Sequence, residues 1–86
     1  MQTPSVALNI GADVGKDDVA MACAGESFAP RKIHNQRPAL VAFLKDLPAG
    51  SRIGMEATGS YHELLAELAH QCGFVVYVLN PKDTRH

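Results

Sequence analysis

The chain has 86 residues, with 8 Lys and Arg against 9 Asp and Glu, and a formal net charge of -1. With 47% hydrophobic residues, its composition is that of a folded globular domain and excludes a disordered segment. The near-neutral charge argues against a dedicated nucleic-acid-binding module, which carries a clear basic excess, but it does not exclude a catalytic domain whose partner domain grips nucleic acid. No apolar run is long enough to span a membrane and no signal-type segment opens the chain, so we expect a cytoplasmic protein without membrane partners.

The first third of the chain is predicted to form three meandering strands. Residues 6–14 (VALNIGADV) are rich in β-formers, and we expect a strand that is buried on both faces. Gly15 then supplies the positive φ that a tight hairpin requires, and residues 19–24 return antiparallel to the first strand. Residues 27–34 follow as a third strand, which Pro30 places at an edge of the sheet.

Two helices alternate with two further strands in the rest of the chain. Asn35 is the expected N-cap of a helix over residues 36–47, and residues 52–56 (RIGME) form a short fourth strand. Ser60 and Glu63 have the spacing of a capping box, which predicts the start of a second helix. One apolar stripe runs along that helix, formed by Tyr61, Leu64, Leu65, Leu68, Ala69 and Cys72.

The second helix is predicted to end at Gly73, a typical C′ residue, and to lead into a fifth strand. Residues 74–79 (FVVYVL) are almost continuously apolar, which predicts a parallel strand that is covered on both sides. Residues 81–86 are interpreted as the start of a linker. Cys23 and Cys72 lie in apolar surroundings without metal-type spacing, and we expect both to be buried free thiols in a reducing compartment.

The predicted order β-β-β-α-β-α-β defines a mixed α/β sheet. Right-handed crossovers place the fourth strand beside the first and the fifth beyond it. The expected strand order is therefore 3-2-1-4-5, with strands one, four and five parallel.

Two acidic residues end neighbouring strands of this predicted sheet. Asp13 lies near the carboxyl end of the first strand and Glu56 ends the fourth, at the edge where open α/β sheets place their sites. Converging carboxylates repel unless they share a proton or a cation, and Mg²⁺ and Mn²⁺ prefer such oxygen ligands. The residues alone leave two other interpretations open: Asp13 could cap the turn that follows it, and Glu56 could pair with Arg52.

These features resemble a known family. The element order with an acid at the end of strands one and four resembles the ribonuclease H-like fold. More narrowly, GADVGKDDVAMA and GMEATGSYHELLAELAHQCGFVVYVLNP resemble the N-terminal, RuvC-like domain of DEDD-type insertion-sequence transposases, the group that includes the pilin gene inverting recombinases. The resemblance extends from Leu8 to Pro81. It implies that residues 1–86 are one truncated domain, from which the C-terminal part of the fold is missing.

The resemblance implies roles for two residues and a chemistry. Asp13 matches the first acid of the DEDD tetrad and Glu56 the second, as catalytic ligands of Mg²⁺ or Mn²⁺. The other two acids are expected after residue 86, since Asp83 follows the Asn-Pro stretch too closely to be the third. The implied activity of the whole protein is DNA strand cleavage and joining, with DNA and a guide RNA as candidate partners. The fragment alone is expected to bind metal weakly or not at all, and to be inactive.

Four further residues are candidate nucleic-acid contacts. Lys16 lies in the turn beside Asp13, where it could meet a phosphate or remain a solvated turn lysine. Thr58 and Ser60 belong to the loop before the second helix, whose free N–H groups could hold a phosphate, although the capping box competes for them. Tyr61 is interpreted first as a packing residue and second as a substrate contact.

Two other classes of function compete with the transposase interpretation. An actin-like ATPase or sugar kinase also has an Asp-x-Gly turn between its first strands, but Lys16 and Asp17 stand where that loop usually carries hydroxyl side chains. A non-catalytic, self-associating module is the third interpretation, because an isolated half-domain exposes apolar surface that association would bury. We therefore expect a homo-oligomer.

Overall fold

A computed structural model describes residues 7–25, 29–57 and 59–80 of the chain. The element order of these residues is the predicted one. In chain order the elements are β1 (Asn9–Val14), β2 (Asp18–Cys23), β3 (Arg31–His34), α1 (Arg37–Lys45), β4 (Arg52–Glu56), α2 (Glu63–Gln71) and β5 (Val75–Leu79). The expectations for Pro81 to His86, Asp83 included, and for the start of the third strand at 27 and 28 lie outside the described residues.

The five strands form one mixed sheet in the order β3-β2-β1-β4-β5. β1 pairs antiparallel with β2 and parallel with β4, and β4 pairs parallel with β5. The predicted strand order and directions are therefore confirmed, and β3 is an edge strand as Pro30 indicated. This arrangement of strands and helices is that of a ribonuclease H-like fold.

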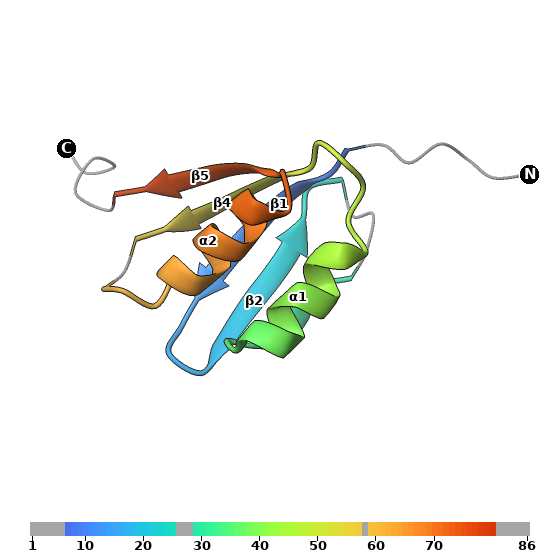
Figure 1. Ribbon diagram of the computed structural model, residues 1–86. Coiled ribbons are helices and arrows are strands. Elements are labelled where there is room, and N and C mark those ends of the chain that lie inside the picture. The colour runs from blue at the N-terminus through green and yellow to red at the C-terminus, as the bar shows by residue number, and fades with distance from the viewer. Residues whose placement is uncertain (1–6, 26–28, 58, 81–86) are drawn as a thin grey trace, which may run out of the picture.

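Both helices cover the same face of the sheet (Figure 1). Every second residue of β1 and β2 is buried, which is the period of a strand with one covered face. Each helix packs apolar side chains, spaced three or four residues apart, against this covered face. The largest fully buried apolar side chains of this core are Val19, Met21 and Ile53 from the sheet and Leu40, Leu44 and Leu65 from the helices.

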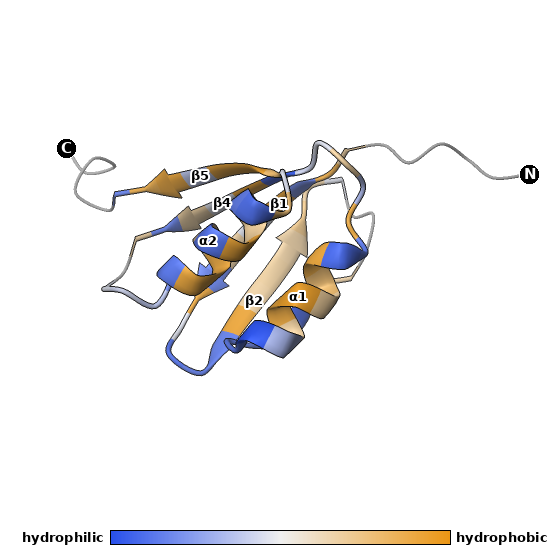
Figure 2. Cartoon of the chain, viewed as in Figure 1, coloured by the Kyte–Doolittle hydropathy of each residue, from blue (hydrophilic) through white to orange (hydrophobic). Residues whose placement is uncertain are grey.

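The opposite face of the sheet is open to solvent, which corrects two predictions. β1 is buried on one face only, with Gly11 and Asp13 exposed. β5 was predicted to be covered on both sides, but Tyr77 and Leu79 are each 50% exposed. β5 is an edge strand with few side chains packed over it, although its residues are among the most hydrophobic of the chain (Figure 2).

The helix starts also differ from the predictions. α1 has Gln36 rather than Asn35 as its N-cap, and no side chain caps it. α2 has His62 as its N-cap, and the predicted capping box does not form: the Glu63 N–H donates to the Ser60 backbone carbonyl at 3.2 Å, without a side-chain cap. Both helices are consequently shorter than the sequence indicated.

Of two predictions about glycine conformation, the structure confirms one and contradicts the other. Gly73 follows the C-cap of α2 with φ 87, which confirms the predicted C′ position. Gly15 was predicted to have a positive φ, but it is not among the described glycines with that conformation. Its N–H donates to the Asp18 carbonyl at 2.8 Å and closes the turn in another way.

The cysteines are both free thiols, as predicted. Cys23 is buried at the end of β2, but Cys72 is exposed, so its predicted burial is wrong. Cys72 is the C-cap residue of α2, one residue beyond the end of the helix. Neither described helix is long and apolar enough to cross a membrane.

Candidate metal centre

Asp13 and Glu56 lie side by side at the carboxyl edge of the sheet. The parallel pairing of β1 with β4 runs from Asn9 opposite Arg52 to Ala12 opposite Met55. One step further along both strands brings Asp13 next to Glu56. Both residues follow buried neighbours and are themselves exposed, so both side chains are on the open face. Because adjacent strands are about 4.8 Å apart, one ion can contact both carboxylates.

A groove of about 530 Å³ lies on the open face, with these two acids in its lining. Its floor has small residues on three neighbouring strands: Gly11 pairs with Gly54 on one side and with Ala22 on the other. A Cβ atom built on either glycine would meet nothing within 4 Å. The absence of side chains therefore leaves open space directly beside the acids.

Neither carboxylate has an ion-pair or hydrogen-bond partner among the described residues, where the one ion pair joins His34 to Asp18 at 3.3 Å. The Asp13 side chain does not cap its turn. Arg52 is at the far end of β4 and donates from Nη1 to Asn9 Oδ1 at 3.4 Å rather than to Glu56. The two acids are thus free to accept an external cation.

The chemistry of the pair suits a hard divalent ion. Two carboxylates supply oxygen ligands, and the cation offsets their mutual repulsion. In the described part of the chain, no group of three or more His, Cys, Asp or Glu residues could hold a metal. An ion bound by this pair would therefore take its remaining ligands from water or from groups outside these residues.

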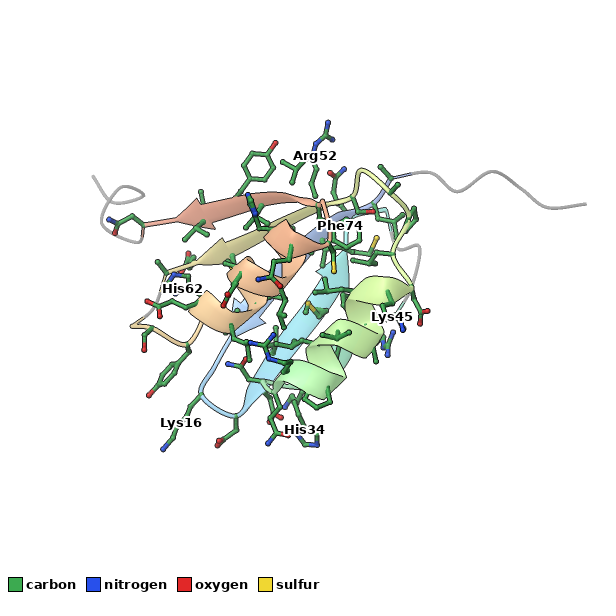
Figure 3. All side chains as sticks on the ribbon, in the orientation of Figure 1. Lys16, His34, Lys45, Arg52, His62 and Phe74 are labelled. Atoms are coloured by element: carbon green, nitrogen blue, oxygen red, sulfur yellow. The ribbon has the colours of Figure 1, made fainter. Side chains whose placement is uncertain are left out.

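Three other predicted site residues, Lys16, Ser60 and Tyr61, lie in the loops that follow β1 and β4. Lys16 points away from the sheet at the tip of the β1–β2 turn (Figure 3). Ser60 and Tyr61 are exposed in the turn before α2, and Tyr61 does not join the apolar stripe. Thr58 lies outside the described residues. The structure therefore brings together Asp13 and Glu56, whereas Lys16 extends into solvent.

Two features of the site were missed in the sequence. Glycine precedes the acid by two residues in both strands, as Gly11-Ala12-Asp13 and Gly54-Met55-Glu56, and this repeat is visible in the sequence. The second feature is Asn35, whose side chain donates hydrogen bonds to the loop after β1 and to the loop after β4. Its only sequence signal was the position before a helix, which indicated an N-cap.

The sheet order and the acids at the ends of β1 and β4 define the class, a ribonuclease H-like domain with two neighbouring acids at the carboxyl edge of its sheet. A family model described as transposase, for DEDD transposases of the IS110 type, matches residues 10–86. The chain therefore belongs to this transposase family, and the resemblance seen in the sequence is confirmed. A search of curated proteins finds no match.

Proposed function

We propose that the chain is the N-terminal portion of the RuvC-like catalytic domain of a DNA transposase, in which Asp13 and Glu56 hold Mg²⁺ or Mn²⁺. The observation that carries this proposal is the register of β1 and β4, which puts two unpaired carboxylates on one face at one edge. The family match to a transposase agrees with it. We propose a cytoplasmic location for the whole protein.

The described residues account for part of the chemistry. Asp13 and Glu56 would hold a divalent ion from fixed strand positions. Such an ion, when bound, would supply charge stabilisation to the phosphoryl oxygens. The groove over Gly11 and Gly54 keeps the approach to the two acids free of side chains. Because the described residues supply this site with two ligands only, we expect the chain by itself to bind the ion weakly and to be inactive on DNA.

Nucleic acid is the proposed partner at this edge. Lys16, Ser60 and Tyr61 belong to the loops that follow β1 and β4, and all three are exposed. The ammonium group of Lys16 could contact a phosphate of the backbone. The ring of Tyr61 could stack on a base. Thr58 belongs to the same loop by sequence. DNA is the expected ligand of the whole protein, and a guide RNA is a further candidate.

The metal proposal is tested by titrating the chain with Mn²⁺ and recording paramagnetic broadening of its amide resonances by NMR. We expect broadening centred on Asp13 and Glu56, with dissociation in the millimolar range. Asp13→Asn should remove it because the neutral amide binds a hard cation poorly. Asp17→Asn is the matched control, since it removes the same charge from a neighbouring exposed site. Equal broadening in wild type and in Asp13→Asn would contradict the proposal, and saturable, Mg²⁺-dependent ATP binding would favour the kinase alternative.

We further propose that the chain forms a homo-oligomer through the open face of β5. Every second side chain of this edge strand projects from the uncovered face. These residues are Val75, Tyr77 and Leu79, and each has an exposed fraction of 42 to 50%. Large apolar side chains gathered on one surface are typical of association sites. An edge strand also offers unpaired backbone groups to a second strand.

Tyr77→Lys is expected to weaken this association by about 2 kcal/mol, or roughly thirtyfold in dissociation constant, because it puts a charge into an apolar contact. Sedimentation equilibrium measures the change. Tyr61→Lys is the matched control, since Tyr61 is similarly exposed at 45% but lies in the loop before α2. A wild-type chain that sediments as a monomer at high concentration would exclude self-association.

A further inference from the structure

The side chain of Asn35 connects two loops that are distant in the sequence. Its Nδ2 donates to the Gly15 carbonyl at 2.9 Å and to the Tyr61 carbonyl at 3.1 Å. Gly15 directly follows β1, the strand that carries Asp13, and Tyr61 is in the turn between β4 and α2. One amide group thus holds the segments that follow both acidic strand ends.

Hydrogen bonding fixes the orientation of this amide. Both partners are carbonyl oxygens, so a flipped amide would place oxygen against oxygen. The Asn35 Oδ1 atom is consequently turned away, and it is buried without a hydrogen-bond partner. A buried acceptor left unmatched is unfavourable, and the two donated bonds are what the structure gains from this arrangement.

Capping of α1 does not explain this side chain. The N-cap of α1 is Gln36, and the helix has no side-chain cap. The backbone of Asn35 is itself bound to the β1–β2 turn, because its N–H donates to the Asp17 carbonyl at 2.8 Å. The residue is thus anchored to one loop through its backbone and reaches the other through its side chain.

We infer that Asn35 is a positioning residue, which fixes the ends of β1 and β4 beside each other and so sets the spacing of Asp13 and Glu56. The inference rests on the proposed metal site for its functional meaning. The pairing of β1 with β4 ends at Ala12 and Met55, while Asp13 is paired with Ala20 of β2 and Glu56 with Leu79 of β5. Each acid is thus held by the outer neighbour of its strand, and the gap between the two acids needs a further support. Asn35 supplies that support without touching the ion.

Ser51 provides a matched control at the opposite end of the same strands. It is fully buried, and its Oγ accepts from the Leu8 N–H at 3.0 Å and donates to the Pro48 carbonyl at 2.7 Å. Like Asn35, it joins two segments through one polar side chain. Unlike Asn35, it supports the amino end of β4, away from the acids.

The test compares Asn35→Ala, Asn35→Asp and Ser51→Ala in this chain by NMR. The first measurement needs no metal: nuclear Overhauser contacts between the backbones of Asp13 and Glu56, relative to those between Asn9 and Arg52. We expect Asn35→Ala to weaken the contacts at the acidic end alone, and Ser51→Ala to weaken those at the other end alone. Asn35→Asp keeps the shape, loses both donated bonds and turns a carboxylate oxygen toward the two carbonyls, so it should weaken the contacts at the acidic end at least as strongly as Asn35→Ala.

The second measurement is the Mn²⁺ titration. We expect Asn35→Ala to raise the dissociation constant about tenfold, the size of effect seen for residues that orient metal ligands, and Ser51→Ala to leave it unchanged. Unaltered contacts between Asp13 and Glu56 in both Asn35 variants would overturn the inference, as would equal Mn²⁺ binding by Asn35→Ala and Ser51→Ala. A wild-type chain without Asp13-dependent broadening would reject the metal proposal instead, and the metal-free contacts would still decide the role of Asn35.

Discussion

Asp13→Asn in the complete transposase is expected to lower the rate of DNA strand cleavage about a thousandfold. Charge stabilisation by a bound metal is worth several kcal/mol in phosphoryl chemistry, and about 4 kcal/mol corresponds to three powers of ten in rate. Asparagine keeps the size of the side chain and removes its charge. The loss therefore reports the ligand role and not a change in packing, because Asp13 is exposed on the open face.

Cleavage of a labelled DNA substrate under single-turnover conditions measures this loss. Asp46→Asn is the control, since Asp46 is an exposed acid at the C-cap of α1, and it should cleave at the wild-type rate. Glu56→Gln should lose as much as Asp13→Asn, and the double variant should lose little more, because residues that hold one ion act as a unit. Wild-type cleavage by either single variant would contradict the assignment of that acid.

The sheet order was predictable because few arrangements satisfy the connection rules. Short turns pair β1 with β2 and β2 with β3, and right-handed crossovers then leave one place for β4 and β5. That order makes β1 and β4 parallel neighbours, and because each acid is at the carboxyl end of its strand, Asp13 and Glu56 lie side by side. The fold and the acidic pair were thus accessible from the sequence because both depend on topology more than on side-chain detail.

The solvent exposure of one face of the sheet could not be predicted from the sequence in the same way. Gly11, Ala20 and Ala22 are small and apolar on the open face, so hydropathy does not distinguish them from core residues. β5 is apolar throughout although several of its residues are exposed. The period of two does separate the faces of β1, since Asp13 alternates with buried Ala12 and Val14, and this signal was outweighed by average hydropathy.

The structure of the loops depends on hydrogen bonds between residues far apart in the sequence, which local sequence patterns do not indicate. Asn35 was assigned to the cap of α1 on the strength of its neighbours, yet its side chain bonds residues 20 and 26 positions away. Ser60 and Glu63 have the spacing of a capping box, but the helix starts too late for Ser60 to occupy the N-cap. Tertiary contacts thus override capping preferences in the segments that surround the candidate site.

Leu65→Ala is expected to destabilise the chain by about 2–5 kcal/mol, the usual cost of truncating a buried leucine. Leu65 is fully buried on α2, where it packs with the sheet residues that form the core. A domain of this size has a free energy of unfolding of about 4–13 kcal/mol, at roughly 0.05–0.15 kcal/mol per residue. One truncation therefore removes a large share of the total, because a single layer of two helices covers the sheet.

Urea unfolding followed by circular dichroism measures the difference, and Leu64→Ala is the matched control on the same helix. Leu64 is only partly buried against the core, so its truncation leaves a smaller cavity and should cost about 1 kcal/mol. Both variants change the helix propensity equally, and the contrast between them isolates burial. Equal destabilisation by the two variants would mean that α2 does not present Leu65 to the sheet, and the one-sided core described above would then be wrong.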